Sequence, residues 1–327
     1  MNIMKNNNTI KWGIIGLGNI ANQFASDLLL LEDAEIFAVA SRNKDKAIEF
    51  ANKYNCPKAY DSYDELFKDD QVDIIYIATP HDSHAELSIK ALENGKHVLC
   101  EKPMSLSYND AIRMIEASKK YNKFFMEAFW TRFIPSVQEV LAKINQGIIG
   151  DIKSVKADFS FYADEKLGGR LFEKNNGGGA LFDIGVYPLF LSYIILGNPK
   201  EIIGKSINHK NGIDLQTSMI LQYENAQSTL QASIVSESDM KATISGTEGY
   251  IQLNAPWFIA DGYSVFKGEK ESKYNLPNFG KGYTYEAIEC HKCIRNNQIE
   301  SLLWSHQNSL DLSKIVEEIK NQIGLEF

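Results

Sequence analysis

The stretch Gly16-Leu17-Gly18-Asn19-Ile20-Ala21 decides the fold class of this 327-residue chain. It follows directly on the apolar run Ile10–Ile15, and a helical pattern continues from it to about Leu31. A strand that turns through G-x-G-x-x-A into a helix is the dinucleotide-binding fingerprint, because the first glycine permits the tight turn and the second lets backbone approach a pyrophosphate. The helix N-terminus also attracts phosphate groups. The motif therefore predicts a dinucleotide-binding α/β domain.

The strand-helix pattern repeats after this motif. Further strands are predicted at Glu35–Ala40, Val72–Ala78, His97–Cys100 and Phe124–Ala128, with helices between them. This alternation is typical of a doubly wound parallel sheet. From Asp151 the pattern changes to period-two alternation. In Thr229–Ile234, for example, apolar and polar side chains point to opposite faces, as in an antiparallel sheet covered on one side.

We therefore predict an α/β protein with a Rossmann-type doubly wound parallel sheet, followed by an α+β domain with a large, mostly antiparallel open sheet. Residues 10–128 are assigned to the dinucleotide-binding domain and residues 129–327 to a substrate-binding and dimerisation domain. The C-terminal helix, 309–323, is a candidate to pack back on the first domain. A chain of 327 residues exceeds what one hydrophobic core usually supports, which agrees with two domains.

The formal charge of -8 argues against nucleic acid or an anionic membrane as the main partner. No apolar run approaches the roughly 20 residues that span a bilayer, and the longest, Ala180–Leu196, is interrupted by Asp183, Gly185 and Pro188. Residues Met1–Thr9 are polar and lack the apolar core of a secretory signal. The chain is thus expected in the cytoplasm.

Two of the four cysteines, Cys290 and Cys293, have the C-x-x-C spacing of redox and zinc sites. They lie in a helical pattern, and no second cysteine pair is available to complete four zinc ligands. The interpretation as two unrelated helix residues is favoured over a redox or metal site. The cytosol keeps such thiols reduced.

The second predicted strand ends at Ser41-Arg42, where an NAD enzyme usually places Asp or Glu to bind the ribose 2′-hydroxyl. A guanidinium at this place can pair with a 2′-phosphate, and Lys44 and Lys46 follow closely. The pattern predicts NADP(H) in preference to NAD(H). The alternative is that Arg42 only begins a surface helix.

Lys102 stands in Cys100-Glu101-Lys102-Pro103, directly after a predicted buried strand. Proline keeps the preceding residue out of helical geometry, so Lys102 is expected to be extended at a carboxyl end of the sheet, where ligands bind. The alternative is a solvated loop lysine. The Lys102–Pro103 bond is a candidate for the cis form. Thr79-Pro80, at the end of another strand, suits a turn beside the cofactor, whereas His84 in a first helical turn is usually a surface residue.

A second informative segment runs from Arg170 to Pro188. Gly177-Gly178-Gly179 is costly in chain entropy and predicts a backbone that must come close to something. Asp183 and Tyr187 follow, four residues apart and so on one face if the segment is helical. From the residues alone, a structural role for this pair is at least as well supported as a functional one.

Together these motifs resemble the glucose-fructose oxidoreductase/inositol dehydrogenase (Gfo/Idh/MocA) family across essentially the whole chain. The family pattern Asp-x-Gly-x-His appears here with Tyr187 in place of histidine, which is similar to the branch containing glucose-fructose oxidoreductase and dimeric dihydrodiol dehydrogenase. The stretches 57–60, 98–104 and 127–133 resemble the NADP-dependent D-xylose and dihydrodiol dehydrogenases of that branch. The loop 161–176, which helps shape substrate choice in the family, is the least transferable part.

The resemblance implies a hydride transfer between NADP(H) and a carbinol carbon of a sugar, such as D-xylose, or of a trans-dihydrodiol. Tyr187 is expected as the acid/base, because the ammonium of Lys102 would lower a phenol pKa that is otherwise near ~10. Asp183 would orient substrate hydroxyls or Lys102, which makes Lys102, Tyr187 and Asp183 the candidate catalytic residues. The alternatives are a non-catalytic NADP-binding regulator of this fold and an NADPH-dependent ketone or dicarbonyl reductase.

The candidate cofactor-binding residues are Gly16, Gly18, Asn19, Ile20, Ser41, Arg42, Thr79, Pro80, His81, His84, Glu101, Lys102 and Arg132. The candidate substrate-binding residues are Trp130, Arg170, Asp183 and Tyr187, and no metal ligand is expected. The resemblance also implies a homodimer that pairs through the open face of the C-terminal sheet. That face is expected to include Ser228, Gln231 and Ser233.

Overall fold

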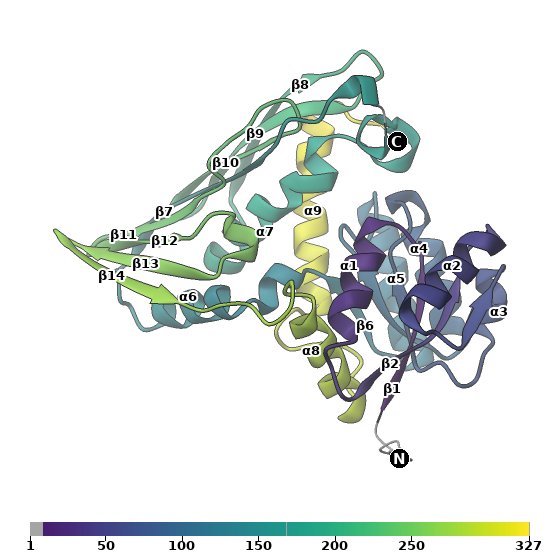
Figure 1. The fold of residues 1–327 in the computed structure, drawn as a ribbon. Helices are drawn as coiled ribbons and strands as arrows, with labels where there is room; N and C mark the ends of the chain where they lie inside the picture. Colours follow the sequence, from purple (N-terminus) through teal and green to yellow (C-terminus); the bar gives the residue numbers. More distant parts are fainter. Residues whose placement is uncertain (1–8, 168, 327) are drawn as a thin grey trace. The chain divides into compact units, whose positions relative to one another are not determined.

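The computed structural model describes residues 9–167 and 169–326. Residues 1–8, on which most of the prediction about a leader rests, lie outside the described residues. The described chain forms two compact units (Figure 1). The first comprises 9–105, Asn109–Trp130 and Phe279–Ser309, and the second comprises Leu106–Tyr108, Thr131–Asn278 and 310–326.

The first unit is built on a parallel sheet, as the sequence predicted, and the sheet has six strands, of which β3 was not predicted. Its strands are β1 (Ile10–Ile15), β2 (Ala34–Ala40), β3 (Lys58–Tyr60), β4 (Ile74–Ile77), β5 (His97–Glu101) and β6 (Phe125–Ala128). They lie in the order β3-β2-β1-β4-β5-β6, and every neighbouring pair is parallel. The chain reverses its direction of winding between β1 and β4, which is where doubly wound sheets bind their ligands.

The helices of this unit follow from local sequence signals. They are α1 (Asn19–Leu28), α2 (Lys44–Tyr54), α3 (Tyr63–Phe67), α4 (His84–Glu93), α5 (Tyr108–Tyr121) and α8 (Thr284–Arg295). In α2, for example, the Asn43 side chain accepts a hydrogen bond from the Lys46 amide at 3.1 Å, and the left-handed Asn55 ends the helix.

Residues Phe279–Ser309 group with the first unit, although the sequence assigned everything after Ala128 to the second domain. The reason is a set of long-range polar contacts. The buried carboxylate of Asp27 accepts hydrogen bonds from the amides of Lys281 and Tyr283 at 2.8–2.9 Å. Trp12 donates its indole N–H to His291 Nε2 at 3.0 Å. These partners are far apart in sequence, so the periodicity of α8 could not indicate its place.

The second unit contains an eight-stranded sheet with one parallel pair. Its strands are β7 (Ile152–Ser160), β8 (Glu201–Asn208), β9 (Asp214–Gln222), β10 (Gln227–Ser233), β11 (Ala242–Gly246), β12 (Gly249–Leu253), β13 (Gly262–Lys267) and β14 (Lys270–Asn275). They lie in the order β14-β13-β12-β11-β7-β10-β9-β8, and only β7 and β10 run parallel. The mostly antiparallel open sheet is thereby confirmed, and β8, β13 and β14 are strands that the sequence analysis had not identified.

One face of this sheet is covered and the other is open. Leu230, Ala232 and Ile234 are buried on the covered face, where α7 (Val186–Leu196) lies against β7 and β10 (Figure 1). The expectation that Ser228 belongs to the open face is wrong, because its position has the parity of Leu230 and its hydroxyl lies 2.6 Å from the Ser192 hydroxyl in the core. Ser233 is also buried.

The remaining helices are α6 (Pro135–Asn145) and α9 (His306–Gln322). The division between the units falls within α9, and from Leu310 onward the chain belongs to the second unit rather than the first. There the Gln322 side chain accepts from the Gly204 amide at 2.7 Å and donates to the Ile202 carbonyl at 2.8 Å. These two hydrogen bonds attach the end of α9 to the edge strand β8.

One helical run among the described residues, Lys174–Leu196, is long and apolar enough to cross a membrane, contrary to the expectation from the sequence. In its most apolar window, 78% is buried inside the protein. Such burial is typical of a core helix that packs against a sheet.

Candidate active site

The turn between β1 and α1 has the geometry that a dinucleotide requires. Gly16 has a φ of +78°, and a Cβ there would lie 2.3 Å from the backbone of Ala78 and Thr79. Only glycine therefore allows β1 to turn so close to the end of β4. At Gly18 the nearest atom to such a Cβ is 3.9 Å away, and no side chain caps the N-terminus of α1 at Asn19. Unpaired amides at a helix start suit phosphate oxygens, so the turn fits a pyrophosphate.

The end of β2 carries the residues that were predicted to choose the cofactor. The Ser41 hydroxyl accepts from the Asn43 amide at 3.2 Å, and the Arg42 side chain is exposed. Lys44 pairs with Asp61 at 3.6 Å. A guanidinium in this position can meet a ribose 2′-phosphate, and β2 itself ends in Ser41-Arg42 without the acid that NAD enzymes usually place there.

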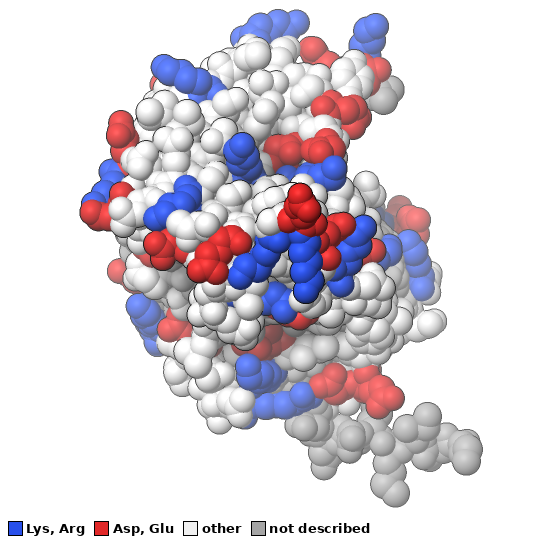
Figure 2. Space-filling view, turned by 90° about the vertical axis from the view of Figure 1, so that its left-hand side faces the viewer, with Lys and Arg blue, Asp and Glu red and all other residues white. Residues whose placement is uncertain are grey.

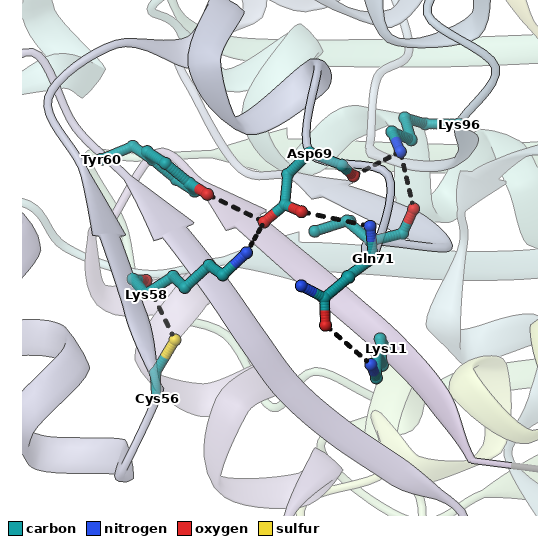
Figure 3. A network of polar contacts seen from close by, with 8 residues as sticks. Lys11, Cys56, Lys58, Tyr60, Asp69, Gln71 and Lys96 are labelled. Atoms are coloured by element: carbon teal, nitrogen blue, oxygen red, sulfur yellow. Dashed lines mark hydrogen bonds and ion pairs between the residues drawn. The ribbon is translucent and has the colours of Figure 1, made fainter. Parts of the chain in front are cut away.

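A polar network around Asp69 holds β3, the strand that lies beside the end of β2 (Figure 3). Asp69 accepts hydrogen bonds from Lys58 and Tyr60, both at 2.8 Å, and its backbone carbonyl accepts from Lys96 at 2.6 Å. Partial burial raises the pKa of Asp69, but the hydrogen bonds from Lys58, Tyr60 and the Gln71 amide and the charge of Lys58 together outweigh it, and the net pKa lies below its ordinary value. The network fixes Tyr60, whose carbonyl accepts the Ser41 amide at 3.2 Å.

The turn after β4 contains Thr79, Pro80 and His81, and the Ser83 hydroxyl oxygen lies 2.8 Å from both the Thr79 hydroxyl and the Pro80 carbonyl, to which it can donate its one proton. His84 follows at the start of α4. The sequence suggested a surface residue, but the side chain is 0% exposed. Its ring nitrogens lie 2.8 Å from the Thr79 carbonyl and 2.9 Å from the Pro103 carbonyl. The Pro103 carbonyl, which follows the neighbouring strand β5, therefore covers a side chain that helix periodicity alone places at the surface.

Lys102 lies immediately after β5, at the same edge of the sheet as the turns that follow β1 and β4. Its peptide bond to Pro103 is cis, as predicted. The preceding Glu101 is buried and accepts hydrogen bonds from the Tyr76 hydroxyl and, at 3.3 Å, from the Lys102 amide. The first unit thus places Gly16, Thr79 and Lys102 at the carboxyl ends of three adjacent parallel strands.

Trp130 and Arg132, from the segment that follows β6, were predicted to face the substrate and the cofactor. The Trp130 indole is 7% exposed and stacks on the Tyr283 ring with centroids 4.4 Å apart and an interplanar angle of 7°. The backbone carbonyl of Arg132 accepts from Gln138 at 2.5 Å. One face of the Trp130 indole is therefore covered by the ring of Tyr283, which directly precedes α8.

The predicted substrate residues Arg170, Asp183 and Tyr187 are brought together in the second unit. Asp183 lies in a single π-helical turn, Leu181–Gly185, and Tyr187 lies in the first turn of α7. The Arg170 guanidinium forms an ion pair with the Asp183 carboxylate. The Tyr187 ring packs against Phe159 and Phe258, with centroids 5.4 and 5.6 Å apart, and those two phenylalanines stack at 4.0 Å. The result is a charged pair next to an aromatic wall.

The triple glycine before this helix does approach other groups closely, as predicted. A Cβ on Gly178 would lie 2.6 Å from the Leu171 carbonyl oxygen, and one on Gly179 would lie 2.3 Å from Asp214 Oδ1. The buried Asp214 carboxylate accepts from the Leu181 amide at 2.8 Å and from the Thr217 hydroxyl at 2.5 Å. It therefore caps the helix that carries Asp183 and Tyr187.

Sequence reasoning missed several residues that shape these sites. Asp214 and the two phenylalanines were not singled out, and Glu127 was noted only within a resembling stretch. Glu127 is a buried acid within the apolar strand β6, and an acid in an apolar run is a signal that could have drawn notice. No comparable local signal marks Phe159 or Phe258.

No group of three or more potential metal ligands is found in the part of the chain that the structure describes. Cys290 and Cys293 are buried free thiols in α8. Burial raises the pKa of both, to about 12 for Cys293. Thiols that stay protonated are poor nucleophiles and poor metal ligands, which agrees with a structural role.

Comparison with known proteins defines the class. Residues 10–129 match the profile of the oxidoreductase family with an NAD-binding Rossmann fold, and residues 137–252 match the GFO/IDH/MocA C-terminal domain. The chain belongs to the Gfo/Idh/MocA family of oxidoreductases. Its first unit is an NAD(P)-binding Rossmann domain.

The chain is similar over its whole length to trans-1,2-dihydrobenzene-1,2-diol dehydrogenases. It is 36% identical to that of Xenopus tropicalis, covering 97% of this chain and 99% of the relative, and 34% identical to that of Homo sapiens, covering 97% and 98%.

Among solved structures, the fold is shared with the 3-ketoreductase KijD10 of Actinomadura kijaniata in complex with NADP and TDP-benzene (24% identity, TM-score 0.87, 97% and 98% covered). It is also shared with an aldose-aldose oxidoreductase of Caulobacter crescentus complexed with glycerol (21%, 0.88, 96% and 97%).

Proposed function

We propose that this protein is an NADP(H)-dependent dehydrogenase that oxidises a carbinol carbon of a trans-dihydrodiol or of an aldose such as D-xylose. The observation that carries the proposal is the similarity, over 97% of the chain, to proteins named trans-1,2-dihydrobenzene-1,2-diol dehydrogenase. The turn at Gly16 and the uncapped start of α1 support the cofactor class, because they offer backbone amides to a pyrophosphate.

The proposed mechanism assigns one task to each of three residues. Tyr187 accepts the proton of the substrate hydroxyl, and Lys102 stabilises the phenolate and orients that hydroxyl. Asp183, held by Arg170, accepts a hydrogen bond from a neighbouring hydroxyl. The bound nicotinamide supplies the carbon that takes the hydride, so that the C–H and O–H bonds break and a carbonyl forms. The reverse direction, the reduction of a ketone, uses the same residues.

The preference for NADP(H) is supported by the end of β2. Arg42 is exposed there, and Ser41 stands where NAD enzymes usually have an acid. A 2′-phosphate can take a bidentate pair from the guanidinium, whereas a 2′-hydroxyl finds no carboxylate acceptor.

The substrate class is supported by the surroundings of Tyr187. Phe159 and Phe258 pack against its ring, and Phe161, Leu171 and Phe172 belong to the same partly buried apolar cluster. Flat aromatic faces suit a six-membered ring with few polar substituents, and the Asp183–Arg170 pair supplies a polar group for vicinal hydroxyls. This combination favours a trans-dihydrodiol and also accommodates the apolar face of a sugar.

The decisive experiment is a panel of trans-dihydrodiols, aldoses and inositols, assayed with NADP+ and with NAD+, with Lys102→Ala as the inactive control. We expect the formation of NADPH with a dihydrodiol or an aldose, at a kcat/KM well above that with NAD+. Tight NADPH binding without turnover on any member of the panel, or on the corresponding ketones in reverse, would instead support a regulator of the same fold.

We also propose a homodimer that pairs through the open face of the second sheet. Ile203, Ile207 and Ile220 are 45%, 59% and 39% exposed on β8 and β9. Together with β10 and β11 these strands line a surface hollow of about 520 Å³. Exposed apolar rows of this kind mark interaction surfaces. Light scattering should give twice the chain mass for the wild type and the monomer mass for Ile207→Lys; a monomeric wild type at micromolar concentration contradicts the dimer.

A cytoplasmic location and a small-molecule partner complete the proposal. All four cysteines are free thiols, which suits a reducing compartment. On the face drawn in Figure 2, Lys and Arg are interspersed with Asp and Glu and with uncharged areas. A nucleic-acid site would need a continuous basic surface.

A further inference from the structure

The peptide unit between Pro103 and Met104, directly after Lys102, is held at both ends by buried ionisable side chains. His84 Nδ1 lies 2.9 Å from the Pro103 carbonyl oxygen. The Met104 amide donates to Glu127 Oε1, also at 2.9 Å. His84 is 0% exposed and Glu127 is 4% exposed.

Both ring nitrogens of His84 face oxygens that can only accept a hydrogen bond. The second contact is from Nε2 to the Thr79 carbonyl, at 2.8 Å. A neutral imidazole has one donor and one acceptor nitrogen, whereas the imidazolium has two donors. The two acceptor contacts fit the imidazolium form of His84, which would donate to both carbonyls. A buried cation is stable only with a compensating partner.

Glu127 has the complementary set of partners. Besides the Met104 amide, the Trp304 indole N–H at 3.3 Å and the Ser309 hydroxyl at 2.7 Å donate to its carboxylate. The Met104 amide and the Trp304 indole N–H can only donate, which matches a carboxylate that only accepts. Burial raises the pKa of Glu127, and the bonds from Ser309, Met104 and Trp304 and the charge of Lys102 offset only part of that rise, so the net pKa stays above its ordinary value.

We propose that His84 and Glu127 are positioning residues that clamp the Pro103–Met104 peptide between opposite charges and thereby fix the direction of the Lys102 side chain. A cation on the carbonyl and an anion on the N–H both act along the peptide dipole, and charge-assisted hydrogen bonds are stronger than those between neutral groups. His84 also ties this peptide to the Thr79 turn after β4. The inference rests on the proposed function in one respect, namely that Lys102 acts on the substrate.

The first test uses two substitutions that separate the two contacts of His84. The amide nitrogen of asparagine stands where Nδ1 stands, so His84→Asn keeps a donor for the Pro103 carbonyl and loses the bond to Thr79. His84→Gln reaches further and keeps the donor for Thr79 instead. We expect His84→Gln to lower kcat by on the order of 10- to 100-fold, the loss that a misplacement of about 1 Å produces, with KM unchanged. His84→Asn should lose much less kcat than His84→Gln. Equal losses in the two variants would overturn the clamp.

The second test removes the negative charge of Glu127, which faces the N–H of the Pro103–Met104 peptide. Glu127→Gln should lower kcat in the same way as His84→Gln, because an amide cannot accept on both sides. The double variant should be hardly worse than either single one, since both act on one peptide. The matched control is Glu289→Gln, in which another buried carboxylate of the same unit is replaced by an amide that cannot accept from both Ser301 and Lys292. That control should lose thermal stability and keep kcat within about twofold. A control loss as large as that of Glu127→Gln, or fully additive effects in the double variant, would contradict the proposal.

A third measurement does not depend on turnover. In ¹⁵N NMR of the full-length protein near neutral pH, both His84 ring nitrogens should carry a proton in the wild type. In ¹³C NMR after reductive dimethylation, assigned with Lys102→Arg, the Lys102 signal should move in Glu127→Gln and stay in Glu289→Gln. A neutral His84 ring with one bare nitrogen overturns the clamp. A wild type without turnover on any substrate defeats the proposed function, and the NMR result still decides whether the clamp exists.

Discussion

Gly179 is a position at which the structure predicts a large loss of stability from adding one methyl group. Its φ is +109°, and a Cβ would lie 2.3 Å from Asp214 Oδ1 and 3.1 Å from the Asp214 carbonyl oxygen. A side chain at this φ costs about 1–3 kcal/mol in backbone strain. Displacement of Asp214 also weakens its bond to the Leu181 amide, and a hydrogen bond to a charged group contributes roughly 1.5–3 kcal/mol.

For Gly179→Ala these two contributions sum to about 2.5–6 kcal/mol, and we expect a destabilisation in the middle of that range, about 3–5 kcal/mol. The matched control is Gly169→Ala, since Gly169 has a φ of +111° and nothing lies within 4 Å of its Cβ position. That control carries the backbone strain alone. Because Asp214 caps the helix that carries Asp183 and Tyr187, Gly179→Ala should also reduce kcat.

The assay is thermal and urea unfolding followed by circular dichroism, with the three proteins compared under identical conditions. At about 2–4 °C per kcal/mol for units of this size, Gly179→Ala should melt roughly 6–20 °C below the wild type. The control should fall well short of that shift. If the two variants unfold within about 1 kcal/mol of each other, the close approach to Asp214 has no energetic consequence and the reasoning is refuted.

Three further predictions concern the cofactor, the chemistry and the pH dependence. Arg42→Ala should raise the KM for NADP+ by about tenfold or more and leave the KM for NAD+ nearly unchanged, because only the 2′-phosphate pairs with the guanidinium; equal changes for both cofactors in steady-state assays would contradict this. Tyr187→Phe should lower kcat by on the order of 100-fold or more with little change in KM, and a kcat within about threefold of the wild type would make Lys102 the favoured base. Burial, with the charges of Lys123 and Lys96, lowers the pKa of His97 to about 4 from 6.5, so the unfolded chain binds this proton first as the pH falls and stability is lost from pH 6.5 down to about pH 4. Between pH 7 and pH 5 the folded protein loses about 2 kcal/mol of stability for this reason. The variant His97→Asn can still accept the Phe124 amide, so in urea unfolding it should lose about 2 kcal/mol less than the wild type over this pH range. An equal loss in both proteins would exclude His97 as the cause.

The parallel sheet could be predicted from the sequence because the signals for its strands and turns are local. Each buried strand is a short apolar run that ends in a turn, and the turn at Gly16–Ala21 carries its own backbone requirement. The same locality made the bond before Pro103 a candidate for the cis form, which the structure has.

The sequence failed where a residue's surroundings come from a distant segment. His84 occupies a first helical turn that periodicity places at the surface, yet the Pro103 carbonyl and the Thr79 carbonyl bury it. Ser228 was assigned to the open face of the sheet, but it shares the parity of Leu230 and meets Ser192 in the core. The segment from Phe279 onward joins the first unit because Asp27 accepts its backbone amides.

By itself, the sequence determined the kind of sheet, the phosphate-binding turn after β1, and the strand end that carries Lys102. It also showed that Gly177–Gly179 must approach another group. Only the tertiary structure decided that this group is Asp214, that Asp183 pairs with Arg170, and that His84 and Glu127 meet on one peptide after Lys102. The physical reason is that periodicity and turn geometry depend on neighbouring residues, whereas a buried charge is stable only beside partners that folding brings from elsewhere in the chain.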